Sequence, residues 1–132
     1  MSDVFLDTVG LIATWDTRDQ WHAAADAAYQ QLRHDRRFVT TVLVLWECGN
    51  AAARCPYRPR VNVLRQFLIQ DGALIEPTAQ EIDDAWAAFD RGEAAQAGIV
   101  DHVSFQVMRR LGVTEAFTND KHFQAAGFTL MF

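Results

Sequence analysis

The stretch that decides the fold runs from Asp101 to Asp120 and reads DHVSFQVMRRLGVTEAFTND. Its first part, Asp101–Leu111, has apolar residues at helical spacing, and Gly112 is a residue type that commonly follows the last helical turn. The apolar run Val113–Phe117 predicts a buried strand. A helix that leads into a buried strand and then into an acid is typical of one unit of a parallel α/β sheet.

The rest of the chain repeats this alternation. The expected strands are Val4–Leu6, Phe38–Thr40, Ala73–Ile75 and Phe128–Met131. The expected helical segments are Gln20–His34, Val42 to about Arg54, Arg60–Gln70, the segment that opens at Thr78, and Lys121–Ala125. This order implies one domain over residues 1–132 and the α/β class, a three-layer sandwich whose mostly parallel central sheet carries helices on both faces.

Local patterns predict how the helices begin and what they bury. Thr41 is expected to cap the second long helix, and Thr78–Glu81 has the sequence of a capping box. Gly10 is expected in a turn after the first strand. Three apolar helix faces are expected to be buried: Trp21, Ala24, Ala25, Ala28 and Leu32; Val61, Leu64, Phe67 and Leu68; and Ile82, Ala85, Trp86 and Phe89.

Four acids, Asp7, Glu47, Asp101 and Asp120, lie in or beside segments apolar enough to be buried. A buried charge needs a partner, because its desolvation costs several kcal/mol. Asp7 and Asp120 follow strand ends, where ligands gather in such sheets, and the other two could project from helices into the same crevice. Oxygen ligands without a supporting Cys or His cluster favour a shared Mg²⁺ or Mn²⁺ ion.

Taken singly, three of these acids have ordinary structural explanations. Asp7 could form a turn, Asp101 could favour the first turn of a helix, and Asp120 could cap the short helix after it. Glu47 is harder to explain, since no basic residue stands four positions before or after it.

Composition bounds the function. Half of the residues are hydrophobic and the formal charge is −5. Four carboxylates in a metal site would leave the remainder at about −1, so RNA is not excluded as a substrate.

No apolar run approaches the roughly 20 residues that span a bilayer, and the start lacks a signal-peptide core. Cys48 and Cys55, seven apart on one expected helix, would lie about 10 Å apart, too far for a disulfide. We therefore expect a cytoplasmic protein without a membrane association.

Six short stretches carry a resemblance to a known family: VFLDT at 4–8, WHAAA at 21–25, DHVSF at 101–105, AFTND at 116–120, HF at 122–123 and GF at 127–128. In this order and spacing, the sequence resembles the PIN-domain nucleases and, within them, the VapC toxins of bacterial toxin–antitoxin pairs. The resemblance covers essentially the whole chain and is strongest over its last third.

The resemblance implies a metal-dependent endoribonuclease with Asp7, Glu47, Asp101 and Asp120 as catalytic acids, an RNA substrate, a neutralising antitoxin and a homodimer. Of these acids, Asp7, Asp101 and Asp120 are expected to hold the Mg²⁺ or Mn²⁺, with Glu47 acting through water. The residues expected to orient carboxylates or waters are Thr8, Ser104, Thr118 and Asn119. One departure is Gly98-Ile99-Val100, where relatives often carry a small hydroxyl residue; it bears on a secondary contact and leaves the acids intact.

Three other functions compete with this one. A phosphotransferase could use Asp7 as nucleophile, but the second Asp that haloacid-dehalogenase-like enzymes need is replaced by Val9. The others are a PIN nuclease of RNA processing that is no toxin, and a non-catalytic PIN-like binding module.

His22 and His122 are expected to be packing or surface residues. The arginines around Pro56 and Pro59 fit a phosphate-contact surface and a solvated face equally well: Arg54, Arg58, Arg60 and Arg65.

Overall fold

Five short apolar runs pair into one parallel sheet with the strand order β3-β2-β1-β4-β5. The computed structural model describes residues 2–132. The elements are β1 Val4–Leu6, α1 Thr8–Trp15, α2 His22–Leu32, β2 Phe38–Thr41, α3 Val42–Ala52, α4 Arg58–Gln70, β3 Leu74–Ile75, α5 Ala79–Asp90, α6 Glu93–Gln96, α7 Ile99–Leu111, β4 Glu115–Phe117, α8 Lys121–Ala125 and β5 Thr129–Leu130. The expected α/β class, with a parallel sheet between helices, is confirmed.

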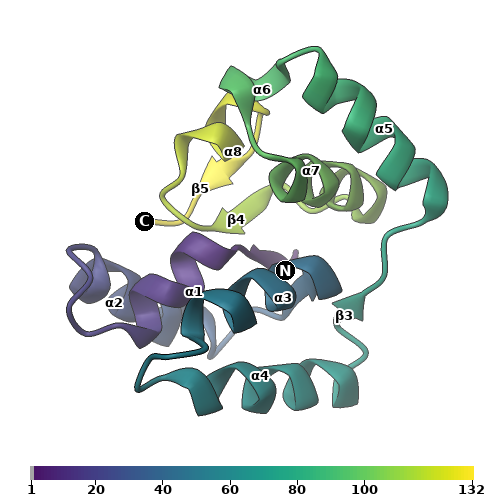
Figure 1. Ribbon diagram of the computed structural model, residues 1–132. Coiled ribbons are helices and arrows are strands. Elements are labelled where there is room, and N and C mark those ends of the chain that lie inside the picture. The colour runs from purple at the N-terminus through teal and green to yellow at the C-terminus, as the bar shows by residue number, and fades with distance from the viewer. Residues whose placement is uncertain (1) are drawn as a thin grey trace.

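The order of the strands reverses beside β1. The chain runs outward from β1 through β2 to β3 and then returns to pair β4 with the opposite edge of β1. Figure 1 shows α5, α6 and α7 on one side of the molecule and α2 and α4 on the other. In parallel sheets a ligand crevice forms where the strand order reverses, outside the carboxyl ends of the strands. Here that place lies beyond Leu6 of β1 and Phe117 of β4.

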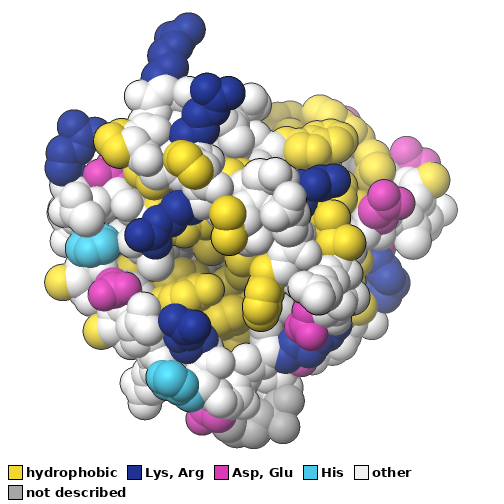
Figure 2. Space-filling model, turned by 90° about the horizontal axis from the view of Figure 1, so that it is seen from below, with side chains coloured by type: hydrophobic (Ala, Val, Ile, Leu, Met, Phe, Trp, Pro, Cys, Tyr) yellow, Lys and Arg dark blue, Asp and Glu magenta, His cyan; other side chains and the backbone are white. Residues whose placement is uncertain are grey.

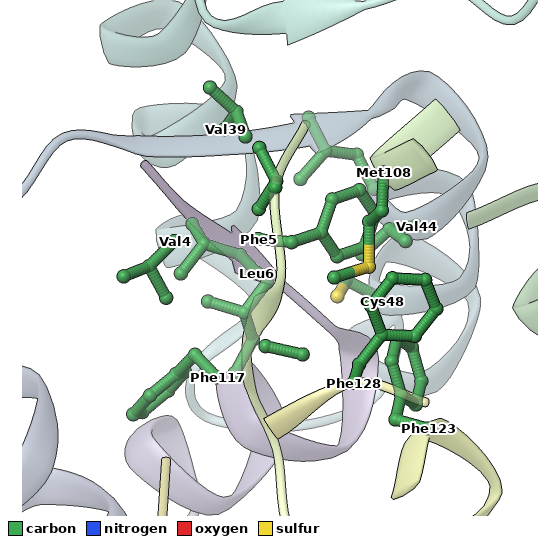
Figure 3. Packing of buried hydrophobic residues seen from close by; sticks show 14 of the residues in the cluster. Val4, Phe5, Leu6, Val39, Val44, Cys48, Met108, Phe117, Phe123 and Phe128 are labelled. Atoms are coloured by element: carbon green, nitrogen blue, oxygen red, sulfur yellow. The ribbon is translucent and has the colours of Figure 1, made fainter. Parts of the chain in front are cut away.

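An aromatic cluster anchors the last third of the chain to β1. Phe105 of α7 meets Phe123 of α8 edge to face, with ring centroids 4.9 Å apart, and Phe123 also lies 6.5 Å from Phe5 of β1. Figure 3 shows Phe5, Phe123 and Phe128 in one apolar cluster with Cys48 of α3. Burying each phenyl ring stabilises the fold by about 2–3 kcal/mol. This packing fixes α7 and α8 over the end of β1.

The predicted helix boundaries that depend on local hydrogen bonds are confirmed. The hydroxyl of Thr41 caps α3 by accepting from the Val44 amide at 3.3 Å. Thr78 and Glu81 form the full capping box of α5. Gly112 ends α7 in the left-handed conformation with φ of 68°. Each of these interactions joins residues at most a few positions apart, which is why the sequence alone predicts them.

The expectation of a turn at Gly10 is wrong, because this residue lies inside α1. A β-carbon at Gly10 would lie 2.1 Å from the carbonyl oxygen of Phe117, closer than any real contact. Glycine therefore lets the first turn of α1 press against the end of β4. This approach, between residues more than a hundred positions apart, brings Asp7 to the residues that follow β4.

The predicted buried face of α5 is wrong by a small rotation. Ala85 is buried as expected, but Trp86 is 49% exposed and Phe89 is 41% exposed. The face that meets α7 is made instead by Glu81, Ala85 and Ala88. Small residues let the two helices approach closely, and Glu81 accepts a hydrogen bond from Arg110 of α7 at 2.8 Å. Glu81, which belongs to the capping box and pairs with Arg110, is therefore buried on the face where the apolar pattern predicted aromatic side chains.

Two other expected faces are buried only in part. Leu68 of α4 is buried, whereas Phe67 is 65% exposed. The helix α2 begins at His22, so Trp21 lies outside it and is half exposed. The helix α3 ends at Ala52, so Cys55 lies beyond it; both cysteines are free, as expected. Within residues 2–132, no helix is both long and apolar enough to cross a membrane.

Candidate active site

Asp7 stands at the junction of β1 and α1 and is only 2% exposed. Its carboxylate caps α1, accepting from the Val9 amide at 3.4 Å, which is a weak bond. The stronger contact comes from the hydroxyl of Thr118, which donates to Oδ2 of Asp7 at 2.8 Å. Asp7 therefore combines the local capping role with a contact to the strand at the other end of the chain.

Thr118 connects two of the four acids. Besides donating to Asp7, its hydroxyl accepts from the backbone amide of Asp120 at 3.0 Å. Asp120 in turn caps α8, accepting from the His122 amide at 2.9 Å. One fully buried hydroxyl therefore fixes the end of β1 relative to the turn after β4.

Asp101 enters the same place from the first turn of α7. A carboxylate oxygen of Asp101, one of Asp120 and a ring nitrogen of His122 all lie within 4.8 Å of one another. Gly98 is the N-cap of α7 and offers no side-chain cap. Asp101 is consequently held by the packing of its helix and keeps its carboxylate available to a ligand.

Glu47 reaches the site from α3 through Thr8. The hydroxyl of Thr8, the first residue of α1, donates to Oε1 of Glu47 at 2.6 Å. Thr8 thus ties α3 to the residue next to Asp7. Among the other two residues expected to orient ligands, Ser104 is buried and its hydroxyl has no hydrogen-bond partner in the described chain. The side chain of Asn119 forms no hydrogen bond to the four acids within residues 2–132.

Burial and the nearness of like charges raise the pKa values of two of the four acids. Burial, followed by the charge of Asp101, raises the pKa of Asp7 to about 8. Burial, followed by the charges of Asp120 and Glu47, raises the pKa of Asp101 to about 7. Across residues 2–132, no lysine or arginine forms an ion pair with Asp7, Glu47, Asp101 or Asp120. The one basic side chain paired with these acids in the described chain is that of His122, which is charged only when it is protonated.

This donor set fits a divalent cation. Carboxylate oxygens are the ligands that Mg²⁺ and Mn²⁺ prefer, and the acids repel one another without a positive charge between them. Asp101 and Asp120 are close enough to share an ion directly. Asp7 interacts electrostatically with both. Glu47 also raises the pKa of Asp101, whereas the group of ligand atoms within 4.8 Å of one another includes neither Glu47 nor Asp7.

His122 is the residue of the site that the sequence did not single out. Its ring nitrogen Nδ1 lies 2.7 Å from Oδ1 of Asp120, and its side chain is 40% exposed, so it is a surface residue that also contacts an acid of the site. The sequence contained a local indication of this contact. The residue two positions after an N-capping Asp donates its backbone amide to that carboxylate, so its side chain lies beside the same oxygen. His22, by contrast, places Nδ1 against the carbonyl oxygen of Ala13, which is a structural contact.

Comparisons with known proteins agree with this geometry. Among solved structures, the chain is similar to the Mycobacterium tuberculosis toxin VapC20, described as cleaving the sarcin-ricin loop. The identity is 27%, the alignment covers 96% of this chain and 97% of VapC20, and the TM-score is 0.76. It is also similar in fold to FitAcB from Neisseria gonorrhoeae, at 16% identity over 98% and 96% of the two chains and a TM-score of 0.65.

Curated protein sequences include no significant match to the chain. The model of the PIN domain, however, matches residues 4–129, from the first strand to the last. All four acids, together with the threonines that hold Asp7 and Glu47, lie inside this range. The chain therefore belongs to the PIN domain family.

Proposed function

We propose that this chain, as a single domain over residues 1–132, is a metal-dependent endoribonuclease and the toxin of a toxin–antitoxin pair. The observation that carries the proposal is the closeness of Asp7, Glu47, Asp101 and Asp120, none of which forms an ion pair with a lysine or arginine of residues 2–132. Membership of the PIN family and the similarity to VapC20, a toxin named for cleaving RNA, support it. We also propose that the chain acts on RNA in the cytoplasm.

In the proposed hydrolysis, three aspartates hold the metal ion, Glu47 orients water, and two threonines position these acids. Asp7, Asp101 and Asp120 would hold the ion, which when bound polarises a scissile phosphate and makes a water molecule more acidic. Thr118 keeps Oδ2 of Asp7 directed at the crevice, and Thr8 does the same for Glu47. Glu47 is half-buried and fixed at one oxygen, so its other oxygen is available to orient water. Hydrogen bonds that are formed before the substrate arrives cost nothing at the moment of reaction.

The purified protein should cleave single-stranded or looped RNA in Mg²⁺ or Mn²⁺ and should stop cleaving when EDTA is added. The physical reason is that four mutually repelling carboxylates cannot approach a phosphate without a cation between them. Gel analysis of a structured RNA, with EDTA and then with excess metal, measures the effect. Undiminished cleavage in EDTA would exclude the metal mechanism and leave a metal-independent nuclease.

We also propose that the neutralising antitoxin binds in a groove between α2 and α4. The groove has a volume of about 910 Å³, and its apolar floor includes Trp15 of α1, Tyr29 of α2 and Leu64 of α4. Figure 2 shows this apolar hollow from below, bordered by basic side chains. Arg33 and Arg60 on its border have no ion pair within residues 2–132. These features fit an amphipathic helix whose apolar face is flanked by acids.

The groove and the acids are connected by α1. The far end of this helix, from Leu11 to Trp15, lines the groove, and its N-cap is Asp7. A helix of eight residues is about 12 Å long. An antitoxin chain that leaves the groove along α1 therefore reaches the crevice within a few residues. An arginine at that point could bridge two of the carboxylates and exclude the metal.

Hydrogen exchange measures this arrangement directly. In the complex with its antitoxin, we expect protection of peptides from α2 and α4, and of the peptides that contain Asp7, Glu47 or Asp101. Peptides from α5 should exchange at the same rate in the free protein and in the complex, because α5 lies on the opposite side of the molecule (Figure 1). Protection of none of the peptides around the acids would contradict the blocking of the site. The homodimer stays a prediction.

A further inference from the structure

The candidate metal site contains one nitrogen donor among its oxygen donors. Within residues 2–132, the group of side chains whose ligand atoms approach one another within 4.8 Å consists of Asp101, Asp120 and His122. We infer that His122 is a direct ligand of the metal ion and that its imidazole makes the site select Mn²⁺, a transition-metal ion, over Mg²⁺. This inference rests on the metal site of the proposed function and adds to that site a ligand and a selectivity.

The geometry around Asp120 already resembles that of two ligands on one ion. The ring nitrogen Nδ1 of His122 lies 2.7 Å from Oδ1 of Asp120. Neighbouring ligand atoms of an octahedral ion, each about 2.1 Å from the metal, lie roughly 3 Å apart. The imidazole and the carboxylate therefore need to separate only slightly to share an ion. The His122 side chain is 40% exposed, which leaves it room on the solvent side for this adjustment.

Asp101 completes the group from a different element. Its first-turn position on α7 sets its carboxylate across from Asp120 and His122, which belong to the start of α8. The aromatic contact between Phe105 and Phe123, at 4.9 Å, fixes these two helices relative to each other a few residues away. The three donors are thus held by the core of the protein, whereas a chance surface cluster would have no such support.

The chemistry of the donors gives the selectivity. Mg²⁺ takes oxygen ligands almost exclusively and holds its waters tightly, so an imidazole adds little to its binding. Imidazole nitrogen binds first-row transition-metal ions better than it binds Mg²⁺. With carboxylates alone, the site would bind the two ions by charge and geometry. With His122 as a ligand, we expect the affinity for Mn²⁺ to exceed that for Mg²⁺, and we expect this difference to depend on the ring.

A second role for His122 must be separated from ligation. The ring could remain a hydrogen-bond donor that orients Asp120 and never touch the ion. The variant His122→Asn distinguishes the two roles, because the amide nitrogen of Asn stands close to the position of Nδ1 and can still donate to Asp120. The amide is a poor metal ligand, so this variant keeps the hydrogen bond and loses the ligand. The variant His122→Gln loses both, and His34→Asn, at an exposed position in the turn after α2, is the matched control.

The experiment uses the full chain, stripped of metal and loaded with one equivalent of Mn²⁺. Pulsed electron paramagnetic resonance should detect a directly bound ¹⁴N nucleus, the coupling should change when the histidines are labelled with ¹⁵N, and it should vanish in His122→Asn. Titrations should show a Mn²⁺ affinity at least ~10-fold lower in His122→Asn and His122→Gln, with the Mg²⁺ affinity changed less than about threefold. The control His34→Asn should match the wild type in both.

Two results would overturn the inference, and they have different consequences. If Mn²⁺ binds the wild type without nitrogen coupling, or if His122→Asn keeps the wild-type affinity and selectivity, His122 is no ligand and the metal-dependent nuclease stands. If the wild type binds no Mn²⁺ at millimolar concentration, the metal site itself is wrong, and the proposed function fails together with the inference.

Discussion

Replacement of Asp101 by asparagine is expected to lower the rate of RNA cleavage at least ~100-fold, the effect of removing one preorganised electrostatic group. Asparagine keeps the size of the side chain and its place in the first turn of α7, so the fold should be retained. The charge that would bind the metal is lost. Single-turnover cleavage of a defined RNA in Mn²⁺ measures the loss, and circular dichroism confirms the fold.

The same experiment should give equal or larger losses for Asp7→Asn and Asp120→Asn, since each removes a charge from the same cluster. Asp83→Asn is the matched control, because Asp83 is an exposed acid of α5 on the far side of α7 from the crevice. It should cleave at the wild-type rate. An Asp101→Asn protein as active as the wild type would show that the acidic cluster does not perform the chemistry.

The metal-free protein is expected to lose stability as the pH rises from about 5 to 8.5, and a divalent metal is expected to reverse most of this loss. The pKa of Asp7 is raised to about 8 and that of Asp101 to about 7 in the folded state. Between their ordinary values and these values, the folded protein holds protons that the unfolded chain has released. The stability associated with the two groups is therefore complete below about pH 4 and is lost as the pH rises through 7 and 8.

Melting temperatures measured across this range with and without Mn²⁺ check the prediction. A ligand that binds only the folded state at a hundredfold excess over its Kd stabilises by about 2.7 kcal/mol. For a domain of this size, that corresponds to roughly 5–10 °C. At pH 8, metal-free Asp101→Asn should melt at or above the wild-type temperature, because one of the repelling charges is gone. It should also respond far less to Mn²⁺.

A site made of unrelated capping acids predicts the opposite pattern. Asparagine caps helices nearly as well as aspartate, so Asp101→Asn would then change the melting temperature little at any pH. Neither protein would respond to metal. A wild type that is indifferent to millimolar Mn²⁺ at pH 8 would thus separate the capping role, which Asp7 and Asp120 do fulfil, from the proposed metal site.

The sequence predicted the features that depend on near neighbours. Thr41 and Thr78 cap helices through hydrogen bonds to residues three positions away, and Gly112 ends α7 by its own backbone conformation. The four acids were also predictable, because an acid in an apolar segment needs an explanation wherever the segment folds. The alternation of helices with short strands fixed the parallel sheet, since few other arrangements bury such strands.

The tertiary structure decided which faces and which side chains meet. The burial of Glu81 and Ala88 in place of Trp86 and Phe89 on α5 depends on the shape of α7, which the apolar pattern of α5 does not contain. The bond between Asp7 and Thr118 joins residues 111 positions apart and exists because Gly10 admits the Phe117 carbonyl. The place of His122 among the acids likewise depends on the packing of α8 against α7. Short-range hydrogen bonds are specified by spacing along the chain. Contacts across the sheet are specified by the fit of whole elements, and that fit exists only in the folded molecule.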